Sequence, residues 1–317
     1  MRGGLVRFYA LSYNPGLGCW RILIDIHYTP SQSNAYRTAM KLREMIPSFV
    51  RSVQLRRLDH TRLNDHQRPV CDTVVSLTSI PSRLRFLDLT IRSLMIQSVR
   101  PRKIVLWLNE GLRGKEPEAL RSLTGDLFMI HYSELTCPHR KLVHTLELYP
   151  ETVIVTSDDD QLYPDNWLEL LYEDHKRFPN EIIANSCKMI AYSADGETLP
   201  YEQWTGKIDP GMSDASLMPV GYNGVLYPPD SLLPEVTDSE LFLRLAPRAD
   251  DLWFKAMSYL KGTSCRKASR PSAKPVPVLG TRKSTLAHTN VKLDQNRAQW
   301  NALRSYYQFT TAGQGKK

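Results

Sequence analysis

Three consecutive aspartates, Asp158, Asp159 and Asp160, follow one residue after an uncharged run of β-favouring residues at 153–156. An apolar run of this length is typical of a strand that is buried on both faces, as in the parallel sheet of an α/β protein. Adjacent carboxylates repel one another unless a cation lies among them, and hard divalent cations take one or two carboxylates together with substrate phosphates. The triplet therefore predicts a metal–diphosphate site, with an acidic cap on the following helix as the plainer alternative.

A second pair of acids, Asp250 and Asp251, opens a clear helical pattern further along the chain. An acid at a helix N-terminus is stabilised by the helix dipole, so a capping role is the first interpretation. A carboxylate in a cleft can instead deprotonate a hydroxyl nucleophile as a general base. The apolar residues 252–254 would raise the pKa of such a base if it were buried. Both roles stay open on this pattern.

Basic residues near the predicted strand ends are candidate phosphate ligands, because phosphate groups need positive charge or backbone N–H donors. Lys141 lies just upstream of the aspartate strand and is the preferred diphosphate contact. Arg282 and Lys283 belong to the same basic set. His288 is a candidate third metal ligand, although a lone histidine is more often a hydrogen-bonded structural residue.

A glycine loop, Gly221-Tyr222-Asn223-Gly224, is the fourth candidate feature. Two glycines around an aromatic residue predict a loop whose backbone must approach a ligand closely, and an irregular hairpin is the alternative. The rings of Tyr222 and Trp204 can stack on a sugar or fill a core. We assign these five residues to an acceptor site.

A strand–helix alternation that begins at residue 72 must position these side chains. Alternation of this kind indicates a mostly parallel sheet with helices on both faces. It breaks over residues 188–233, an irregular stretch of a length that is usually functional. The predicted strands are 72–78, 103–108, 127–132 and 152–156, and the predicted helices are 83–97, 117–123, 139–148, 165–177 and 250–260.

The composition is that of a globular protein with room for a large core. The chain has 317 residues, of which 42% are hydrophobic and 23% charged. Its five cysteines are scattered without metal-ligand or redox spacing, which favours reduced thiols in a cytoplasmic protein. We find no signal peptide and no apolar run that approaches the length of a membrane span.

Most of the net charge of +8 lies in the first seventy residues, which contain eleven Lys and Arg against four Asp and Glu. A basic segment beside a nearly neutral domain suggests an anionic partner, and a solvated surface without a partner is as compatible. We therefore divide the chain into a basic extension, 1–70, and a main domain, 71–317. The extension packs on the main domain or associates peripherally with the inner face of the cell membrane. Within it, 20–28 is a candidate strand and 33–53 an amphipathic helix.

Five short motifs occur in a characteristic order: T-S-I-P-S-R-L after the first strand, W-L-N-E after the second, S-D-D-D-x-x-Y-P, the glycine loop, and A-D-D-L-W-F. In this order they resemble bacterial family 2-like glycosyltransferases, which have the nucleotide-diphosphosugar-binding fold called GT-A, and in particular a branch that builds cell-surface polysaccharides. The resemblance covers residues 72–300. It implies a GT-A fold, a nucleotide-diphosphate sugar donor, Mn²⁺ or Mg²⁺, and a glycan or lipid-linked acceptor in capsule or lipopolysaccharide synthesis.

The resemblance also implies roles for single residues of the donor site. Asp158 and Asp160 match the D-x-D motif, where the first acid contacts the ribose or the metal and the last ligates the metal. Asp159 is grouped with the donor site without a task of its own. The residues that match the loop and strand end around the nucleotide base are Thr78, Pro81, Arg83, Asn109 and Glu110.

For catalysis, the resemblance implies that Asp251 is the general base of an inverting transferase, since it matches the second acid of a Glu-Asp motif. The motif reads Asp-Asp in this chain, so the choice between Asp250 and Asp251 stays open. Retaining transferases of the same fold need no such base.

Two other classes of function compete with this interpretation. A nucleotidyltransferase of sugar phosphates also uses aspartates and Mg²⁺, but it would have a glycine-rich basic loop near the first strand, and T-S-I-P-S-R-L has no glycine. A non-enzymatic nucleic-acid-binding protein would use the basic first seventy residues. These contain no known base-reading motif and no platform of stacking aromatics, so we expect no nucleic-acid partner.

Overall fold

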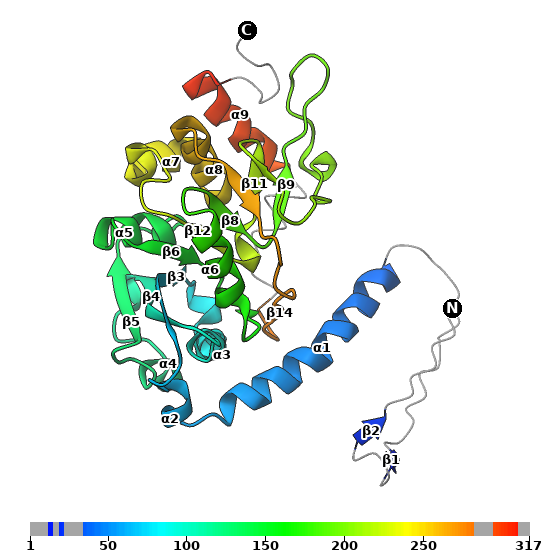
Figure 1. Ribbon diagram of the computed structural model, residues 1–317, viewed down its shortest axis with the longest axis vertical. Coiled ribbons are helices and arrows are strands. Elements are labelled where there is room, and N and C mark those ends of the chain that lie inside the picture. Colours follow the sequence, from blue (N-terminus) through cyan, green and yellow to red (C-terminus); the bar gives the residue numbers. More distant parts are fainter. Residues whose placement is uncertain (1–11, 15–18, 22–33, 282–293, 310–317) are drawn as a thin grey trace. The chain divides into compact units, whose positions relative to one another are not determined.

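The structure, a computed structural model, describes residues 12–14, 19–21, 34–281 and 294–309, with side chains from residue 44 onward (Figure 1). The chain divides into two compact units, Met1–Arg43 and Glu44–Lys317. In the first unit, strands β1 (Ser12–Asn14) and β2 (Cys19–Arg21) pair antiparallel. The candidate strand 20–28 lies mostly outside the described residues. The predicted extension 1–70 thus contributes to both units.

The larger unit is organised around a sheet that has eight strands in the described part of the chain, in the order β10-β13-β8-β12-β6-β3-β4-β5. Four neighbouring pairs are parallel: β3 with β4, β3 with β6, β4 with β5, and β13 with β8. Strand β12 runs antiparallel between β6 and β8, and β10 is antiparallel to β13. The predicted class, α/β with a mostly parallel central sheet flanked by helices, is confirmed.

The four predicted strands are present to within a few residues. The strands of the large sheet are β3 (Val70–Thr78), β4 (Arg100–Asn109), β5 (Phe128–Ser133), β6 (Val153–Thr156), β8 (Ile182–Ala184), β10 (Ser213–Asp214), β12 (Val225–Tyr227) and β13 (Cys265–Lys267). Two smaller antiparallel pairs are β7 (Gln161–Leu162) with β14 (Val276–Pro277), and β9 (Cys187–Met189) with β11 (Leu217–Pro219). The irregular stretch 188–233 therefore contains a central strand, β12, which is too short to show a periodic pattern.

The helices follow the predicted alternation, and the described part of the chain adds three that the pattern did not reveal, α2, α7 and α9. Their bounds are α1 (Asn34–Arg56), α2 (His60–Leu63), α3 (Leu84–Met95), α4 (Glu118–Arg121), α5 (Arg140–Leu148), α6 (Trp167–Arg177), α7 (Ser239–Leu245), α8 (Asp250–Lys261) and α9 (Gln295–Tyr307). Single turns of 3₁₀ helix include η1 (Pro81–Arg83), η2 (Glu110–Leu112) and η4 (Gly221–Asn223).

Alternate residues of the central strands serve two cores, one on each face of the sheet. Ile154 belongs to a cluster that includes residues of α5, α7, α8 and α9, whereas its neighbour Val155 belongs to a cluster that includes residues of α3, α4 and α6. Val225 and Leu226 divide between the same two clusters. This is the period-two geometry of a sheet that is covered on both faces, and it explains why these strands are apolar throughout.

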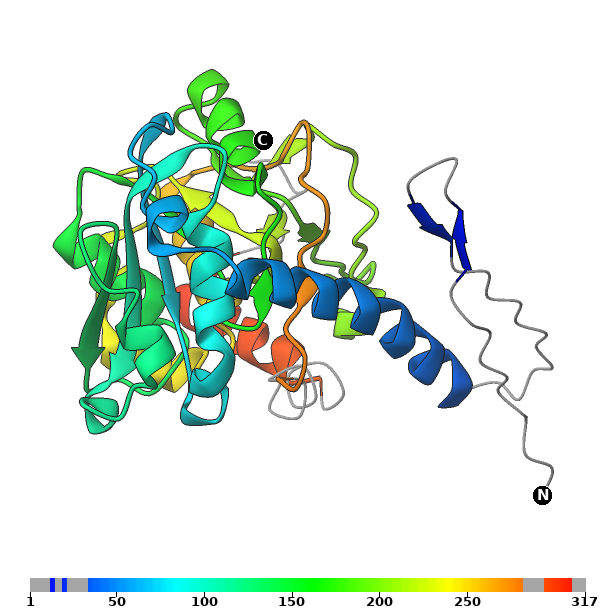
Figure 2. The same cartoon turned by 90° about the horizontal axis from the view of Figure 1, so that it is seen from below.

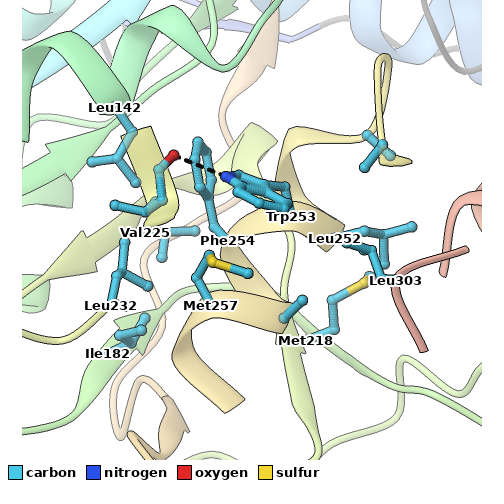
Figure 3. Packing of buried hydrophobic residues seen from close by; sticks show 14 of the residues in the cluster. Leu142, Ile182, Met218, Val225, Leu232, Leu252, Trp253, Phe254, Met257 and Leu303 are labelled. Carbon is cyan, nitrogen blue, oxygen red and sulfur yellow. Dashed lines mark hydrogen bonds between the residues drawn. The ribbon is translucent and has the colours of Figure 1, made fainter. Parts of the chain in front are cut away.

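Helix α8 is fixed by the first of these cores (Figure 3). Its residues Leu252, Trp253, Phe254 and Met257 are all buried, and the indole N–H of Trp253 donates to a backbone carbonyl oxygen 2.9 Å away. A helix that is apolar on most sides belongs in an interior. The core thereby sets the position of the helix N-terminus, where the acidic pair lies. No helix in the described part of the chain is long and apolar enough to cross a membrane.

Candidate active site

A cleft of about 440 Å³ lies at the carboxyl ends of strands β3 and β6. This is the usual position of a ligand site in an open α/β sheet. Five segments form most of its wall: the loop after β3, the start of α5, the aspartate triplet, the loop around η4, and the start of α8. The described residues at its wall include Thr78, Ser79, Arg83, Lys141, Asp158, Asp159, Asp160, Tyr201, Gly221, Tyr222, Arg248, Asp250 and Asp251.

Lys141 connects the two acidic motifs. Its Nζ lies 3.1 Å from Oδ1 of Asp158 and 3.0 Å from Oδ2 of Asp250, and its side chain is only 7% exposed. Burial by itself lowers the pKa of a lysine, but Asp158, Asp250 and Asp251 together raise the pKa of Lys141 well above its usual value. The residue is therefore a fixed positive charge that holds the triplet loop beside the N-terminus of α8.

The two acids of α8 differ in their environment. Burial favours the neutral form of Asp250, but the nearby Lys141 outweighs it and lowers the pKa of this carboxyl below its usual value. For Asp251, burial and the charge of Asp250 raise the pKa to about 7, although Lys141 works in the opposite direction. The pair thus consists of one permanent anion and one carboxyl that titrates near neutral pH.

The glycines of the η4 loop are required by their neighbours. The backbone N–H of Gly221 donates to Oδ2 of Asp251 at 3.1 Å, and a Cβ on Gly221 would lie 2.8 Å from Oδ1 of the same carboxylate. Gly224 has φ of +92°, and a Cβ there would lie 2.4 Å from the ring of Trp167. Trp167 also donates its indole N–H to the Asn223 carbonyl oxygen at 2.8 Å. Close packing of this loop against Asp251 and Trp167 explains both glycines.

Arg83 and Ser79 hold the middle of the triplet. Asp159 is buried, accepts a hydrogen bond from the Ser79 hydroxyl at 2.5 Å and forms an ion pair with Arg83. Burial raises the pKa of Asp159 to about 6 in spite of these partners. Arg83 also contacts Asp160, with Nη2 3.1 Å from Oδ2. Asp159, for which the sequence suggested no task, thus ties the triplet to the loop after β3.

Asp158 and Asp160 are the two carboxylates of the triplet that could hold a divalent cation, and each also pairs with a cationic side chain, Lys141 or Arg83. Asp158 is one-third exposed at the cleft wall, and burial together with the charge of Asp158 raises the pKa of Asp160. Such repulsion is relieved when a cation lies between the carboxylates. No group of three or more His, Cys, Asp or Glu among the described residues is arranged to hold a metal, so water or phosphate oxygens would complete the ligand shell. His288, Arg282 and Lys283 lie outside the described residues.

Arg140 and Tyr163 brace the cleft from behind. The buried guanidinium of Arg140 donates to the backbone oxygens of Leu135 and Ser79, each at 2.6 Å, and to the hydroxyl of Thr78. The phenol oxygen of Tyr163 accepts the backbone N–H of Asp158 at 2.7 Å. Arg140 is therefore committed to the protein itself, in contrast to a side chain that is available to phosphate.

Several predicted site residues are not among the described residues that line the cleft. Asn109 binds the carbonyl oxygens of Ser133 and Glu134, each at 3.2 Å, and Glu110 pairs with Arg113 at the surface. Pro81, Asn223 and Gly224 shape the surrounding loops. Trp204 is buried, and its N–H donates to the carbonyl oxygen of Leu199 at 2.9 Å. Their roles in substrate binding stay predictions.

Tyr201 lines the cleft and was not found from the sequence. Burial and the nearby Asp251 raise the pKa of Tyr201 to about 12, and the ammonium of Lys188 lies 3.8 Å from the centre of its ring. Tyr201 belongs to the irregular stretch, where no periodic pattern indicates which side chains turn inward. Together with Tyr222 it gives this end of the cleft two aromatic rings.

The comparisons with known proteins give distant likenesses. No protein-family model matches the sequence, and no curated protein matches it. Similar solved structures include a CMP:2-keto-3-deoxy-manno-octonic acid synthetase complexed with CTP, with a TM-score of 0.38 and 13% identity over 73% of this chain and 97% of that chain. The 4-diphosphocytidyl-2C-methyl-D-erythritol synthase of Anaerococcus prevotii has a TM-score of 0.39 and 11% identity over 78% of this chain and 99% of that chain. Residues 1–349 of S. aureus TarS have a TM-score of 0.40 and 13% identity over 65% of this chain and 59% of that chain. Likenesses at this level carry no argument about the activity.

Proposed function

We propose that this chain is a metal-dependent, inverting glycosyltransferase of the GT-A fold. It transfers a sugar from a nucleotide-diphosphate donor to a hydroxyl of a glycan or lipid-linked acceptor, in the synthesis of a surface polysaccharide such as capsule or lipopolysaccharide. The observation that carries the proposal is the position of Lys141, which contacts both Asp158 and Asp250 and so unites a candidate donor site with a candidate general base.

Asp251 is the better candidate for the base. A general base works best when its pKa lies near the operating pH, and the pKa of Asp251 is about 7 whereas that of Asp250 is lowered by Lys141. Asp251 takes the proton of the acceptor hydroxyl while the oxygen of that hydroxyl forms a bond to the anomeric carbon. The bond from that carbon to the diphosphate oxygen breaks, and the diphosphate leaves with the electron pair. Gly221 orients the Asp251 carboxylate through its N–H.

The charge of the cleft supports a requirement for a cation. Five carboxylates line it together with four cationic side chains, Arg83, Arg140, Lys141 and Arg248, and Arg83 and Lys141 form ion pairs with the carboxylates. A nucleotide diphosphate would add further negative charge to this acidic wall. Mn²⁺ or Mg²⁺, held by Asp158 and Asp160 together with the phosphates, supplies the neutralisation of the leaving diphosphate when it is bound.

The nucleotidyltransferase is the second candidate, because it also requires acids, a divalent cation and an α/β sheet. Its nucleophile would be the phosphate of a sugar phosphate, which is already an anion at neutral pH and needs no base. A hydroxyl acceptor does need one, and a carboxyl with a pKa of about 7 matches that need. Asp251 therefore favours glycosyl transfer.

The two candidates differ in the product they release. The full chain is incubated with Mn²⁺, a panel of nucleotide-diphosphate sugars and glycan or lipid-linked acceptors, and the release of nucleoside diphosphate is recorded. In parallel, nucleoside triphosphates and sugar phosphates are supplied, and pyrophosphate is recorded. We expect nucleoside diphosphate and a glycosylated acceptor. Pyrophosphate release in its place would establish the nucleotidyltransferase.

A further inference from the structure

The second half of helix α1 presents one face to the body of the larger unit. Ser48 is fully buried and donates its hydroxyl to the carbonyl oxygen of Pro277 at 2.7 Å. Leu55, two turns further on, is fully buried in a cluster with Leu89 of α3, so this part of α1 lies against α3 (blue and cyan in Figure 2). Arg51, on the same side of the helix, pairs with Asp165. These contacts fix the orientation of the helix.

The opposite face of the same helix is apolar and exposed. The exposed fractions are 48% for Met45, 55% for Ile46, 62% for Phe49 and 47% for Val50. At about 100° per residue, these four side chains form one stripe centred nearly opposite the direction of Ser48 and Leu55. The second half of α1 therefore has a covered side that carries Ser48, Arg51 and Leu55, and an exposed side that is apolar.

The stripe, Met45, Ile46, Phe49 and Val50, is a cluster and not a random scatter. Of the ten large apolar side chains that are exposed in the described part of the chain, four lie within these six consecutive residues. Single exposed apolar residues are normal on a protein surface, whereas a contiguous group marks a surface that another body covers.

The charge near the stripe indicates what kind of surface covers it. Arg56, the last residue of α1, and Arg57, which follows it, are both exposed. Residues 44–70, which include the stripe, carry five Arg against three Asp and Glu. A helix with an apolar stripe flanked by basic residues binds the interface of a membrane that contains anionic lipids.

We propose that the stripe on α1 docks this protein on an anionic lipid surface, with Ile46 and Phe49 inserted at the level of the headgroups and Arg57 beside the phosphates. The inference is independent of the reaction that the cleft performs. A series of hydrogen bonds also connects the helix that bears the stripe to the cleft. The Ser48 hydroxyl binds Pro277 of β14, β14 pairs with β7, and the backbone N–H of Val278 donates to the carbonyl oxygen of Asp160 at 2.8 Å.

Co-sedimentation with vesicles tests the proposal on the full chain. Vesicles made of equal parts phosphatidylglycerol and phosphatidylcholine should bind the protein, and vesicles of phosphatidylcholine alone should bind much less. The double variant Ile46→Glu/Phe49→Glu should lose binding by at least about tenfold, which corresponds to about 1.4 kcal/mol. Ile46→Gln/Phe49→Gln should lose binding as well, since removal of apolar contact and not added charge is the cause. Raised salt should weaken binding, because screening shortens the reach of charged lipids.

Two control variants sharpen the result. Leu243→Glu changes an exposed apolar side chain on α7 and should bind like the wild type. Arg57→Gln should reduce binding to the anionic vesicles by about fivefold, the effect of about 1 kcal/mol per basic residue near the surface. Circular dichroism and melting curves of each variant check that the fold is intact.

Three outcomes would overturn the proposal. The first is that wild-type protein fails to bind the anionic vesicles. The second is that the glutamate and glutamine double variants bind as well as the wild type. The third is a concentration-dependent dimer in sedimentation velocity that the double variants dissolve, without any binding to vesicles, which would assign the stripe to a second copy of this chain.

Discussion

The ammonium nitrogen of Lys141 lies 3.0 Å from a carboxylate oxygen of Asp250, and both side chains are buried. Lys141 comes from helix α5 and Asp250 from the start of α8, so the contact joins two elements that are far apart in the sequence. The same nitrogen reaches Asp158 of the triplet at 3.1 Å. This arrangement leaves Asp250 anionic and makes Asp251 the acid that titrates near neutrality.

Replacement of Lys141 by methionine should destabilise the protein by about 3–5 kcal/mol, because it leaves buried carboxylates without their counter-charge. Urea denaturation at neutral pH measures the effect. Lys176→Met is the matched control, since Lys176 pairs with Glu173 at the surface and should change the free energy of unfolding by less than about 1 kcal/mol. Equal effects of the two variants would contradict the role of the buried pair.

The pH dependence of stability should change in the same variant. The folded state lowers the pKa of Asp250, so its ion pair stabilises the protein above the usual aspartate value of 3.8 and loses this effect as the pH falls through that region. In Lys141→Met the effect of burial is no longer opposed by the ammonium, so the pKa of Asp250 should rise and the variant should lose stability as the pH rises above about 4. Unfolding measured between pH 3 and pH 7 should therefore show a deficit of the variant that grows toward pH 7, and a deficit that does not change with pH would argue against the assignment.

Asp251→Asn should lower the rate of transfer by about a hundredfold or more while the donor still binds, since a general base contributes roughly 10²–10⁴. Wild-type activity should rise with pH through about 7 as Asp251 loses its proton, and the variant should lack this rise. Asp209→Asn, at an exposed position outside the cleft, is the control. An unchanged rate in Asp251→Asn would indicate Asp250 as the base or a retaining mechanism.

The same variant should gain stability at alkaline pH. The raised pKa of Asp251 means that the folded state favours the protonated form, so stability falls as the pH rises from about 4 to about 7. Asparagine removes this cost, by about 1.4 kcal/mol for each unit of pKa shift that is relieved. Urea midpoints of both proteins at pH 5 and pH 8 provide the comparison, and we expect the advantage of the variant to be larger at pH 8.

The two glycines of the η4 loop should respond differently to alanine. Gly221→Ala places a Cβ against the Asp251 carboxylate, which should cost about a hundredfold in rate through displacement of that group, with a smaller effect on stability. Gly224→Ala meets the ring of Trp167 at a positive φ and should destabilise the fold by about 3 kcal/mol. A Cβ on Gly125 would meet open space, so Gly125→Ala should change neither the rate nor the stability. An unchanged free energy of unfolding in Gly224→Ala would contradict the packing described for this loop.

Asp160→Ala should uncouple the cation from the nucleotide. In wild-type protein, Mn²⁺ together with a nucleoside diphosphate should raise the melting temperature, since a ligand at a hundred times its Kd stabilises by about 2.7 kcal/mol. The variant should show little shift and no activity, and a chelator should produce the same loss in the wild type. Asp209→Ala is the control. A full shift in Asp160→Ala would remove this residue from the proposed metal site.

The sequence determined the parts of this protein that depend on local pattern. Continuous apolar runs predicted the strands β3 to β6, because a strand covered on both faces must be apolar throughout, and the abrupt change to Asp158–Asp160 marked a site at the end of one of them. The helix that opens with Asp250 and Asp251 was equally clear, since its acids and apolar residues follow helical rules over twelve residues.

Tertiary structure alone decided which of these side chains meet. Lys141 was predicted as a contact to diphosphate, yet its position between Asp158 and Asp250 depends on how α5 and α8 pack on one face of the sheet, which no local pattern encodes. The same packing separates the pKa values of the acidic pair, because burial and charge at a given atom depend on residues remote in the chain. Strand β12, Tyr201 and the bracing role of Asp159 lie beyond sequence reasoning for this reason.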